Sequence, residues 1–194
     1  MSHHPGRLRV QGAWLLGAAM LAAAALAPAT EIDGVASRVG FSLQTRWGQV
    51  LEGRFPTVHG EVSELPDGRH QVRLLLSTRD VEILDHPGYT RFTRGGGFFD
   101  SAHWPQVEFL SDAYAPALLQ QGGSLAGTLH IRGVHRREAF LIRPAACAHP
   151  GLDCDVVASG SIHRSNYGMD RWKFAVSENV GFSLRMRVRR DGGA

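Results

Sequence analysis

The sequence has few of the residues that build a catalytic centre or a metal site. Beyond residue 29 its histidines stand singly, and it contains no Gly-x-Ser-x-Gly, His-Glu-x-x-His, phosphate-binding loop or dinucleotide-binding fingerprint. His130 shares a strand face with Arg132, opposite Leu129 and Ile131, which favours a solvated outer residue over a metal ligand. We therefore expect no catalytic residues, no metal and no cofactor.

A large excess of charge is also absent. The chain has 21 Lys and Arg against 18 Asp and Glu. Without Arg7 and Arg9, which belong to a candidate export signal, 19 basic residues face 18 acidic ones, a net charge of +1. Both signs are interspersed, which argues against a nucleic-acid partner. We interpret Arg185, Arg187 and Arg189 as the solvated face of a strand rather than a membrane or phosphate surface.

Long apolar runs are missing except near the N-terminus, where residues 13–26 are almost wholly apolar. The run is shorter than the ~20 residues of a spanning helix, follows Arg7 and Arg9, and ends in the small-residue site Ala27-Pro28-Ala29. The sequence predicts a cleavable secretory signal at 1–29 and one domain at 30–194, exported to the periplasm. An uncleaved anchor is the alternative.

Cysteine is scarce, since only Cys147 and Cys154 occur. In an exported protein, a pair separated by a turn-like segment predicts a disulfide that clamps the end of a hairpin. A metal site formed with His149 is the alternative, but it lacks a fourth ligand with zinc-like spacing.

Apolar and polar residues alternate in many short segments, as in 39–43, 71–77, 107–111 and 180–188. Period two is the pattern of a half-buried strand, and about eight such strands indicate an antiparallel all-β protein. One short helix is predicted in residues 85–94, because Pro87 suits a first helical turn and glycines follow Arg94.

The central stretch from Gly95 to Phe109 joins three glycines, Phe98-Phe99-Asp100 and Trp104-Pro105 to the start of a strand. It resembles the central signature of the YceI-like family. Further matches follow in the family's order: Ile32-Asp33, Gly53-Arg54-Phe55, Gly127-Thr128-Leu129, Ile131-Arg132-Gly133-Val134 and Arg164 to Met169. Several positions depart from the family pattern: Ala36 replaces a usual His, Phe92-Thr93 a His-Leu pair, Gly97 an acid, His135 a Thr and Tyr167 a Phe.

This resemblance, from Ile32 to about Val188, implies an eight-stranded antiparallel lipocalin-like barrel with one short helix before Phe98-Phe99-Asp100. It also implies a periplasmic binding or carrier protein for an isoprenoid or similar long-chain amphiphile, such as a quinone or a polyprenyl compound. The alternative is a small stress-responsive enzyme or redox accessory protein that uses the pocket for a quinone-like substrate. By analogy, the partners considered are respiratory proteins of the inner membrane, contacted transiently, and a second copy in a homodimer.

The expected ligand site is the inner wall of the barrel and its mouth. Burying an apolar chain yields about 0.8 kcal/mol per methylene group, so the wall needs no polar contact. We expect the mouth to be formed by the short helix with Phe98 and Phe99, and Arg94 to contact anionic head groups. The expected wall residues are Phe41, Leu74, Leu76, Phe109, Leu129, Ile131, Phe140, Ile142, Phe182, Leu184 and Met186.

Overall fold

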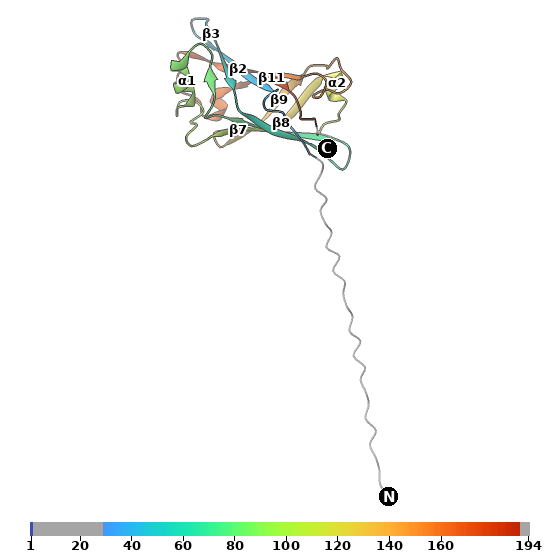
Figure 1. Ribbon diagram of the computed structural model, residues 1–194. Coiled ribbons are helices and arrows are strands. Elements are labelled where there is room, and N and C mark those ends of the chain that lie inside the picture. The colour runs from blue at the N-terminus through green and yellow to red at the C-terminus, as the bar shows by residue number, and fades with distance from the viewer. Residues whose placement is uncertain (2–28, 191–194) are drawn as a thin grey trace.

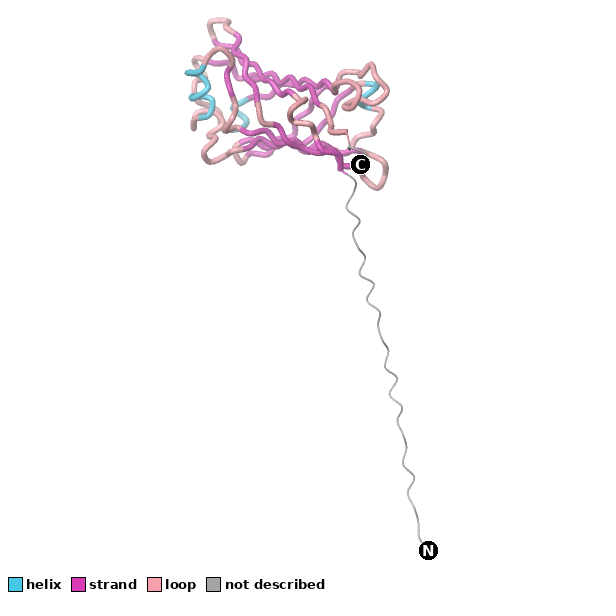
Figure 2. Tube along the Cα trace, in the orientation of Figure 1, coloured by secondary structure: helices cyan, strands magenta, loops and turns pink. Residues whose placement is uncertain are grey.

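One curled antiparallel sheet makes up most of the protein (Figure 1; Figure 2). The computed structural model describes Met1 and residues 29–190, so the predicted signal segment at 2–28 lies outside the described residues. The elements in chain order are β1 (Ala29–Glu31), β2 (Arg38–Thr45), β3 (Val50–Phe55), β4 (Val58–Glu64), β5 (His70–Ser77), β6 (Glu82–Ile83), α1 (Pro87–Arg94), β7 (Gln106–Ser111), α2 (Leu118–Gln121), β8 (Gly123–Ile131), β9 (Val134–Ile142), β10 (Val156–His163), a 3-10 turn (Arg164–Tyr167) and β11 (Val176–Met186).

The expected closed barrel of eight strands is wrong. The described residues contain eleven strands in the order β1-β4-β5-β7-β8-β9-β10-β11-β2-β3-β6, and the sheet curls into a half-barrel whose outermost strands, β1 and β6, do not pair. Sequence reasoning missed β1 and β6 because two or three residues are too few to show a period. It missed β3 because glycines such as Gly48 and Gly53 are more typical of turns than of strands.

The chain segments next to the two termini are joined by backbone hydrogen bonds. The Asp33 amide donates to the Arg187 carbonyl at 2.9 Å, and the Arg189 amide donates to the Glu31 carbonyl at 2.8 Å. Ile32 and Val188 form an isolated antiparallel bridge between them. The first described strand is therefore held between β4 and the continuation of β11.

Phenylalanine rings on the inner face of the sheet lie over glycines of neighbouring strands. A Cβ atom added to Gly53 would come within 2.2 Å of the Phe41 ring, and one added to Gly127 within 2.5 Å of the Phe109 ring. Gly53 pairs directly with Phe41. These glycines are hence required by close packing of the rings, and Gly53 is a strand residue rather than a turn residue.

The helix predicted in residues 85–94 is confirmed as α1, which lies at the opposite end of the molecule from α2 (Figure 1). The segment that follows it seals this end. Asp100 adopts a left-handed conformation, and Phe99 packs on Phe41 and Phe55 with ring centroids 6.1 and 5.5 Å apart. Phe98 instead lies against the guanidinium group of Arg164.

The arginines after the middle of β11 are not simply solvated. Arg185 is exposed, but Arg187 is only 32% exposed and its Nε atom donates to Asp155. Arg189 pairs with Glu31 at 2.7 Å. Arg187 is thus only partly solvated, and it connects the end of β11 to the loop before β10. In the described part of the chain, no helix combines the length and apolarity needed to cross a membrane.

Candidate ligand cavity

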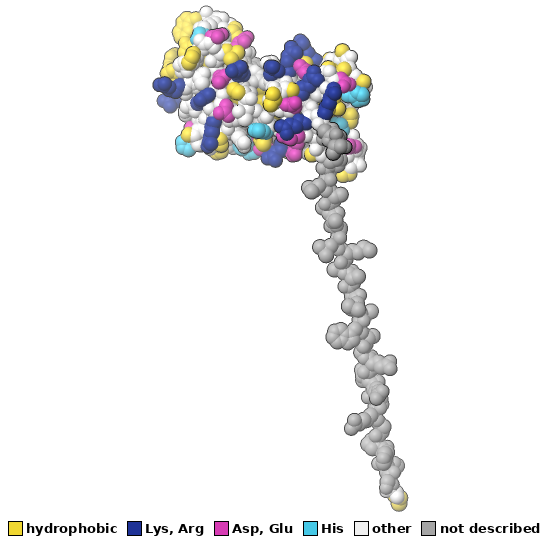
Figure 3. Space-filling view, in the orientation of Figure 1, with side chains coloured by type: hydrophobic (Ala, Val, Ile, Leu, Met, Phe, Trp, Pro, Cys, Tyr) yellow, Lys and Arg dark blue, Asp and Glu magenta, His cyan; other side chains and the backbone are white. Residues whose placement is uncertain are grey.

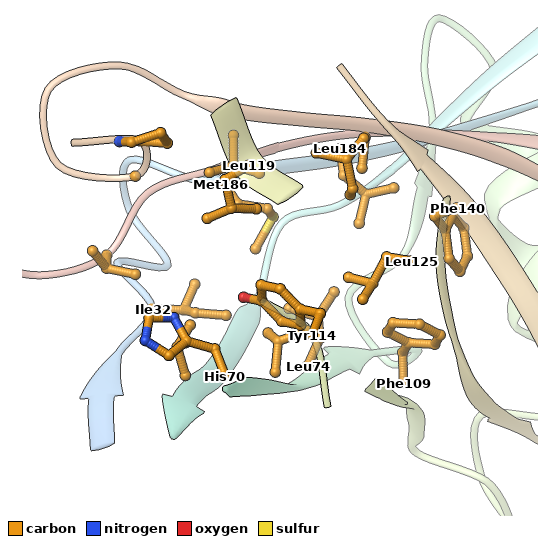
Figure 4. A pocket seen from close by; sticks show the side chains of 18 of the residues that line it. Ile32, His70, Leu74, Phe109, Tyr114, Leu119, Leu125, Phe140, Leu184 and Met186 are labelled. Carbon is orange, nitrogen blue, oxygen red and sulfur yellow. The ribbon is translucent and has the colours of Figure 1, made fainter. Parts of the chain in front are cut away.

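A cavity of about 340 Å³ lies inside the curled sheet, a volume within the range of roughly 300–1,000 Å³ found for ligand pockets. Its wall is formed by apolar side chains of β5, β7, β8, β9, β10 and β11, several of which face one another across the open space in Figure 4. Leu74, Phe109 and Leu125 lie on one side, and Leu184 and Met186 lie on the other (Figure 4). Such a wall suits an apolar ligand.

Nine of the eleven expected wall residues line this cavity. They are Leu74, Leu76, Phe109, Leu129, Phe140, Ile142, Phe182, Leu184 and Met186. Phe41 and Ile131 are buried deeper, beside a second pocket of only about 20 Å³ under α1, and Phe182 lines both spaces. The alternation of the strands therefore brings most of the expected wall together.

The three residues expected at the mouth lie elsewhere. Phe98 and Phe99 line the small pocket under α1, and the Nε atom of Arg94 donates to the Val81 carbonyl at 2.9 Å. None of the three lines the large cavity. The cause is the packing of Phe99 on Phe41 and Phe55, which closes this end of the sheet.

The large cavity extends toward the other end, near α2, for which no site residue was predicted. Its lining there includes Glu64 at the end of β4, His70 at the start of β5, Tyr114 and Leu152. These residues lie at strand ends or in loops, where no periodic pattern marks them. Only the pairing of the strands brings them together, so the sequence offered no signal for this rim.

His70 and Tyr114 form a polar group within this rim. Their backbones exchange two hydrogen bonds of 2.8 Å, and their rings meet edge to face with centroids 6.0 Å apart. The Tyr114 hydroxyl oxygen faces the cavity in Figure 4. Burial raises the pKa of Tyr114 to about 12, so at neutral pH the hydroxyl is uncharged and able to donate a hydrogen bond.

Charge at the cavity is sparse and negative. Glu64 is an exposed lining residue, whereas none of the described lining residues is Lys or Arg. A phosphate or carboxylate ligand would find no Lys or Arg among these lining residues, and it would lie near the Glu64 carboxylate. The electrostatics of the rim thus favour an uncharged head group.

A disulfide between Cys147 and Cys154 stabilises the loop beside the rim, which confirms the predicted pairing. This loop supplies Gly151 and Leu152 to the cavity lining. Arg187 Nη1 donates to the Leu152 carbonyl at 2.9 Å and so binds the loop to β11. The alternative of a metal site at the cysteines is wrong, and residues 29–190 contain no group of three or more His, Cys, Asp or Glu suited to a metal ion.

An antiparallel sheet curled around an apolar, ligand-sized cavity defines a class of all-β proteins with an internal binding space. Within this class the family can be stated. The family model for the YceI-like domain matches residues 31–188, so the chain belongs to the YceI-like family.

Solved structures share the fold at low sequence identity. BcnA of Burkholderia cenocepacia is 23% identical over 82% of this chain and 99% of its own, with a TM-score of 0.64. A polyisoprenoid-binding domain from Saccharophagus degradans, implicated in plant cell wall breakdown, is 12% identical over 83% of this chain and 97% of its own, with a TM-score of 0.60. The YceI protein of Campylobacter jejuni is 16% identical over 72% and 85%, with a TM-score of 0.56. No curated protein matches the sequence.

Proposed function

We propose that this protein binds an isoprenoid or a similar long-chain amphiphile in the cavity of its curled sheet and carries it in the periplasm, without catalysis. The observation that carries the proposal is the apolar cavity of about 340 Å³ inside the sheet. Membership of the YceI-like family and the fold shared with a polyisoprenoid-binding domain support the same class of ligand.

The rim supports a narrower ligand class within this proposal. The uncharged Tyr114 hydroxyl is a hydrogen-bond donor, and Glu64 opposes anions. A quinone carbonyl or a polyprenyl alcohol satisfies both conditions, whereas a polyprenyl phosphate does not.

The periplasmic location is supported by the Cys147–Cys154 disulfide, because disulfides persist in oxidising compartments. Recovery of the protein from a periplasmic fraction, with an N-terminus at residue 30, would test both location and cleavage.

Mass spectrometry of organic extracts from the purified protein tests the binding function. We expect one lipid molecule for each protein chain. Phe109→Asp places an unpaired carboxylate in the wall and should abolish lipid retention, whereas Leu110→Asp, whose side chain is exposed on the outer face, should leave it unchanged.

A second pair of variants covers the case in which Phe109→Asp does not fold. Ala158→Leu fills part of the cavity with apolar atoms, and Ser159→Leu introduces the same side chain on the exposed face of the same strand. Retention should fall only for Ala158→Leu, with thermal unfolding as the check of folding. Extraction of no stoichiometric lipid, together with turnover of a quinone analogue, would reject the carrier and favour the enzyme alternative.

A further inference from the structure

The end of the molecule that carries α1 exposes a cluster of large aromatic side chains, hereafter the aromatic end. It consists of Trp47, Tyr89, Phe92, Trp172 and Phe174. Trp47 is 80% exposed and Phe174 is 66% exposed, far more than such residues are in a core. In the space-filling view, hydrophobic and basic side chains lie together at this end (Figure 3). This surface lies opposite the end of the cavity near α2.

The aromatic residues come from three segments that contact one another. Phe92 of α1 meets Trp172 with ring centroids 6.0 Å apart, and Trp172 meets Phe174 at 5.7 Å. The Arg46 amide donates to the Ala175 carbonyl at 3.0 Å, which places the β2–β3 turn with Trp47 beside the same loop. The cluster is therefore one continuous surface.

The loop that presents Trp172 and Phe174 is held from inside the protein. Arg164 is completely buried, and its guanidinium group donates to the carbonyls of Met169, Arg171, Val176 and Ser177. Trp172 itself has a φ angle of 68°, a left-handed conformation that is unusual for a bulky side chain. A fully buried cation thus fixes the backbone on both sides of two exposed aromatic residues.

The three segments that carry the aromatic residues are basic. The segments 45–50, 85–94 and 170–175 contain five basic residues (Arg46, Arg91, Arg94, Arg171 and Lys173) and two acidic ones (Asp85 and Asp170), a net charge of +3. Residues 30–194 carry 19 basic and 18 acidic side chains, a net charge of +1, so the remainder of the domain has a net charge of −2. The segments that present the aromatic residues are therefore more basic than the rest of the domain.

From these observations we infer that the aromatic end is a docking surface for an anionic lipid bilayer. Tryptophan and phenylalanine insert into the boundary between head groups and acyl chains, and Arg and Lys attract the anionic head groups within a Debye length. A second copy of the chain is a poor occupant because a symmetric dimer would oppose two copies of these basic segments. Docking places the sealed end against the bilayer and the opposite end toward the aqueous phase.

Flotation with vesicles tests the docking surface. Purified protein is mixed with vesicles of phosphatidylcholine alone or with 30% phosphatidylglycerol at about 0.15 M salt. We expect binding only to the anionic vesicles and a decline at higher salt. The double variant W47S/F174S and the double variant R91E/K173E should each reduce the bound fraction at least fivefold.

The matched control is the double variant L141S/R143E, which removes one exposed apolar and one exposed basic residue from β9 and the loop after it. It should bind as the unmodified protein does. All proteins carry W14F, so that brominated acyl chains quench only tryptophans of the domain even if residues 1–29 are retained. We expect the brominated acyl chains of anionic vesicles to quench the tryptophan fluorescence, and we expect less quenching in the variants W47F and W172F.

Two outcomes overturn the inference. One is the absence of both flotation and quenching with anionic vesicles. The other is a loss in the control variant equal to that in W47S/F174S. Light scattering that shows a dimer dissociated by W47S/F174S, without vesicle binding, would assign the surface to self-association instead.

Discussion

Tyr114 is the residue that gives an otherwise apolar cavity a chemical preference. Its ring is buried, its hydroxyl oxygen faces the open space, and burial raises its pKa to about 12. A buried donor that meets an acceptor gains about 1 kcal/mol, whereas the same donor covered by only apolar atoms loses its water contacts and costs about 1–3 kcal/mol.

Tyr114→Phe should therefore weaken binding of a quinone or a polyprenyl alcohol about five- to tenfold, the equivalent of about 1–1.4 kcal/mol. Binding of an isoprenoid hydrocarbon without oxygen should instead become tighter, because it leaves the hydroxyl without an acceptor. Competition against a fluorescent fatty ligand measures both affinities. Arg94→Ala should affect ligands with anionic and with neutral head groups equally, because Arg94 donates a hydrogen bond to the Val81 carbonyl, away from the cavity. A selective loss of binding for anionic ligands would contradict this assignment.

Residues on regular strands could be predicted from the sequence, and residues at the rim could not. Leu74 and Leu76 alternate with polar neighbours, so their inward direction follows from the period of the strand. Phe98 and Phe99 lie in an irregular turn, where the residue type does not reveal which end of the sheet the side chains close. Tyr114 and Leu152 enter the rim only through the pairing of distant strands and the disulfide loop.

At the level of elements, glycines in the strands make room for phenylalanine rings from the neighbouring strands. Phe41, Phe109 and Phe140 each lie over a glycine of a neighbouring strand, where a Cβ atom would come within 2.2 to 2.7 Å of the ring. This arrangement lets bulky rings lie along the inner face and leaves room for the cavity.

Gly127→Ala should lower the free energy of unfolding by about 1–3 kcal/mol, because the added methyl group displaces the Phe109 ring. Gly88→Ala is the opposite case, since Gly88 lies in α1 with nothing within 4 Å of the added Cβ atom. It should stabilise by about 0.5–1 kcal/mol. Urea unfolding of both variants measures the difference, and a loss of similar size in both would contradict the packing argument.

The disulfide loop is the element that closes one side of the rim. Replacing Cys147 and Cys154 by alanine should lower the free energy of unfolding by about 2–3 kcal/mol, because the closed loop is short. Ligand exchange should also become faster, since Gly151 and Leu152 lose their constraint. Thermal unfolding and ligand exchange test these effects, and thiol titration of denatured, unreduced protein should find no free thiol. Two free thiols would reject the clamp.

Long strands such as β5, β8 and β11 were predictable because many alternating residues fix their type and register. The helix α1 was predictable from its proline and the glycines beyond it. The order of the sheet and its failure to close were not, because β1 and β6 are defined by their partners rather than by their own two or three residues.

At the scale of the whole molecule, buried tyrosines set an upper limit of pH for stability. The folded-state pKa of Tyr114 is raised to about 12 by burial, and burial with a hydrogen bond to Glu138 also raises that of Tyr167. Folded protein holds these protons more tightly than unfolded chain does, so their contribution is complete below pH of about 10 and is lost as pH rises above it.

Tyr114 alone should contribute a loss of about 3 kcal/mol between pH of about 10 and 12, at about 1.4 kcal/mol per pH unit. Urea unfolding across this range measures the slope. Tyr114→Phe and Tyr167→Phe should each flatten it, and a slope that neither substitution alters would show that other groups cause alkaline unfolding.

The hydrogen bonds between residues 31–33 and 187–189 place the two ends of the domain side by side. The sheet and its cavity should therefore form even when the chain begins at a different strand. A circular permutant could join residue 190 to residue 29 through a short glycine linker and begin instead at the exposed turn around Gly68. It would surround the same cavity, while its new termini emerged between β4 and β5.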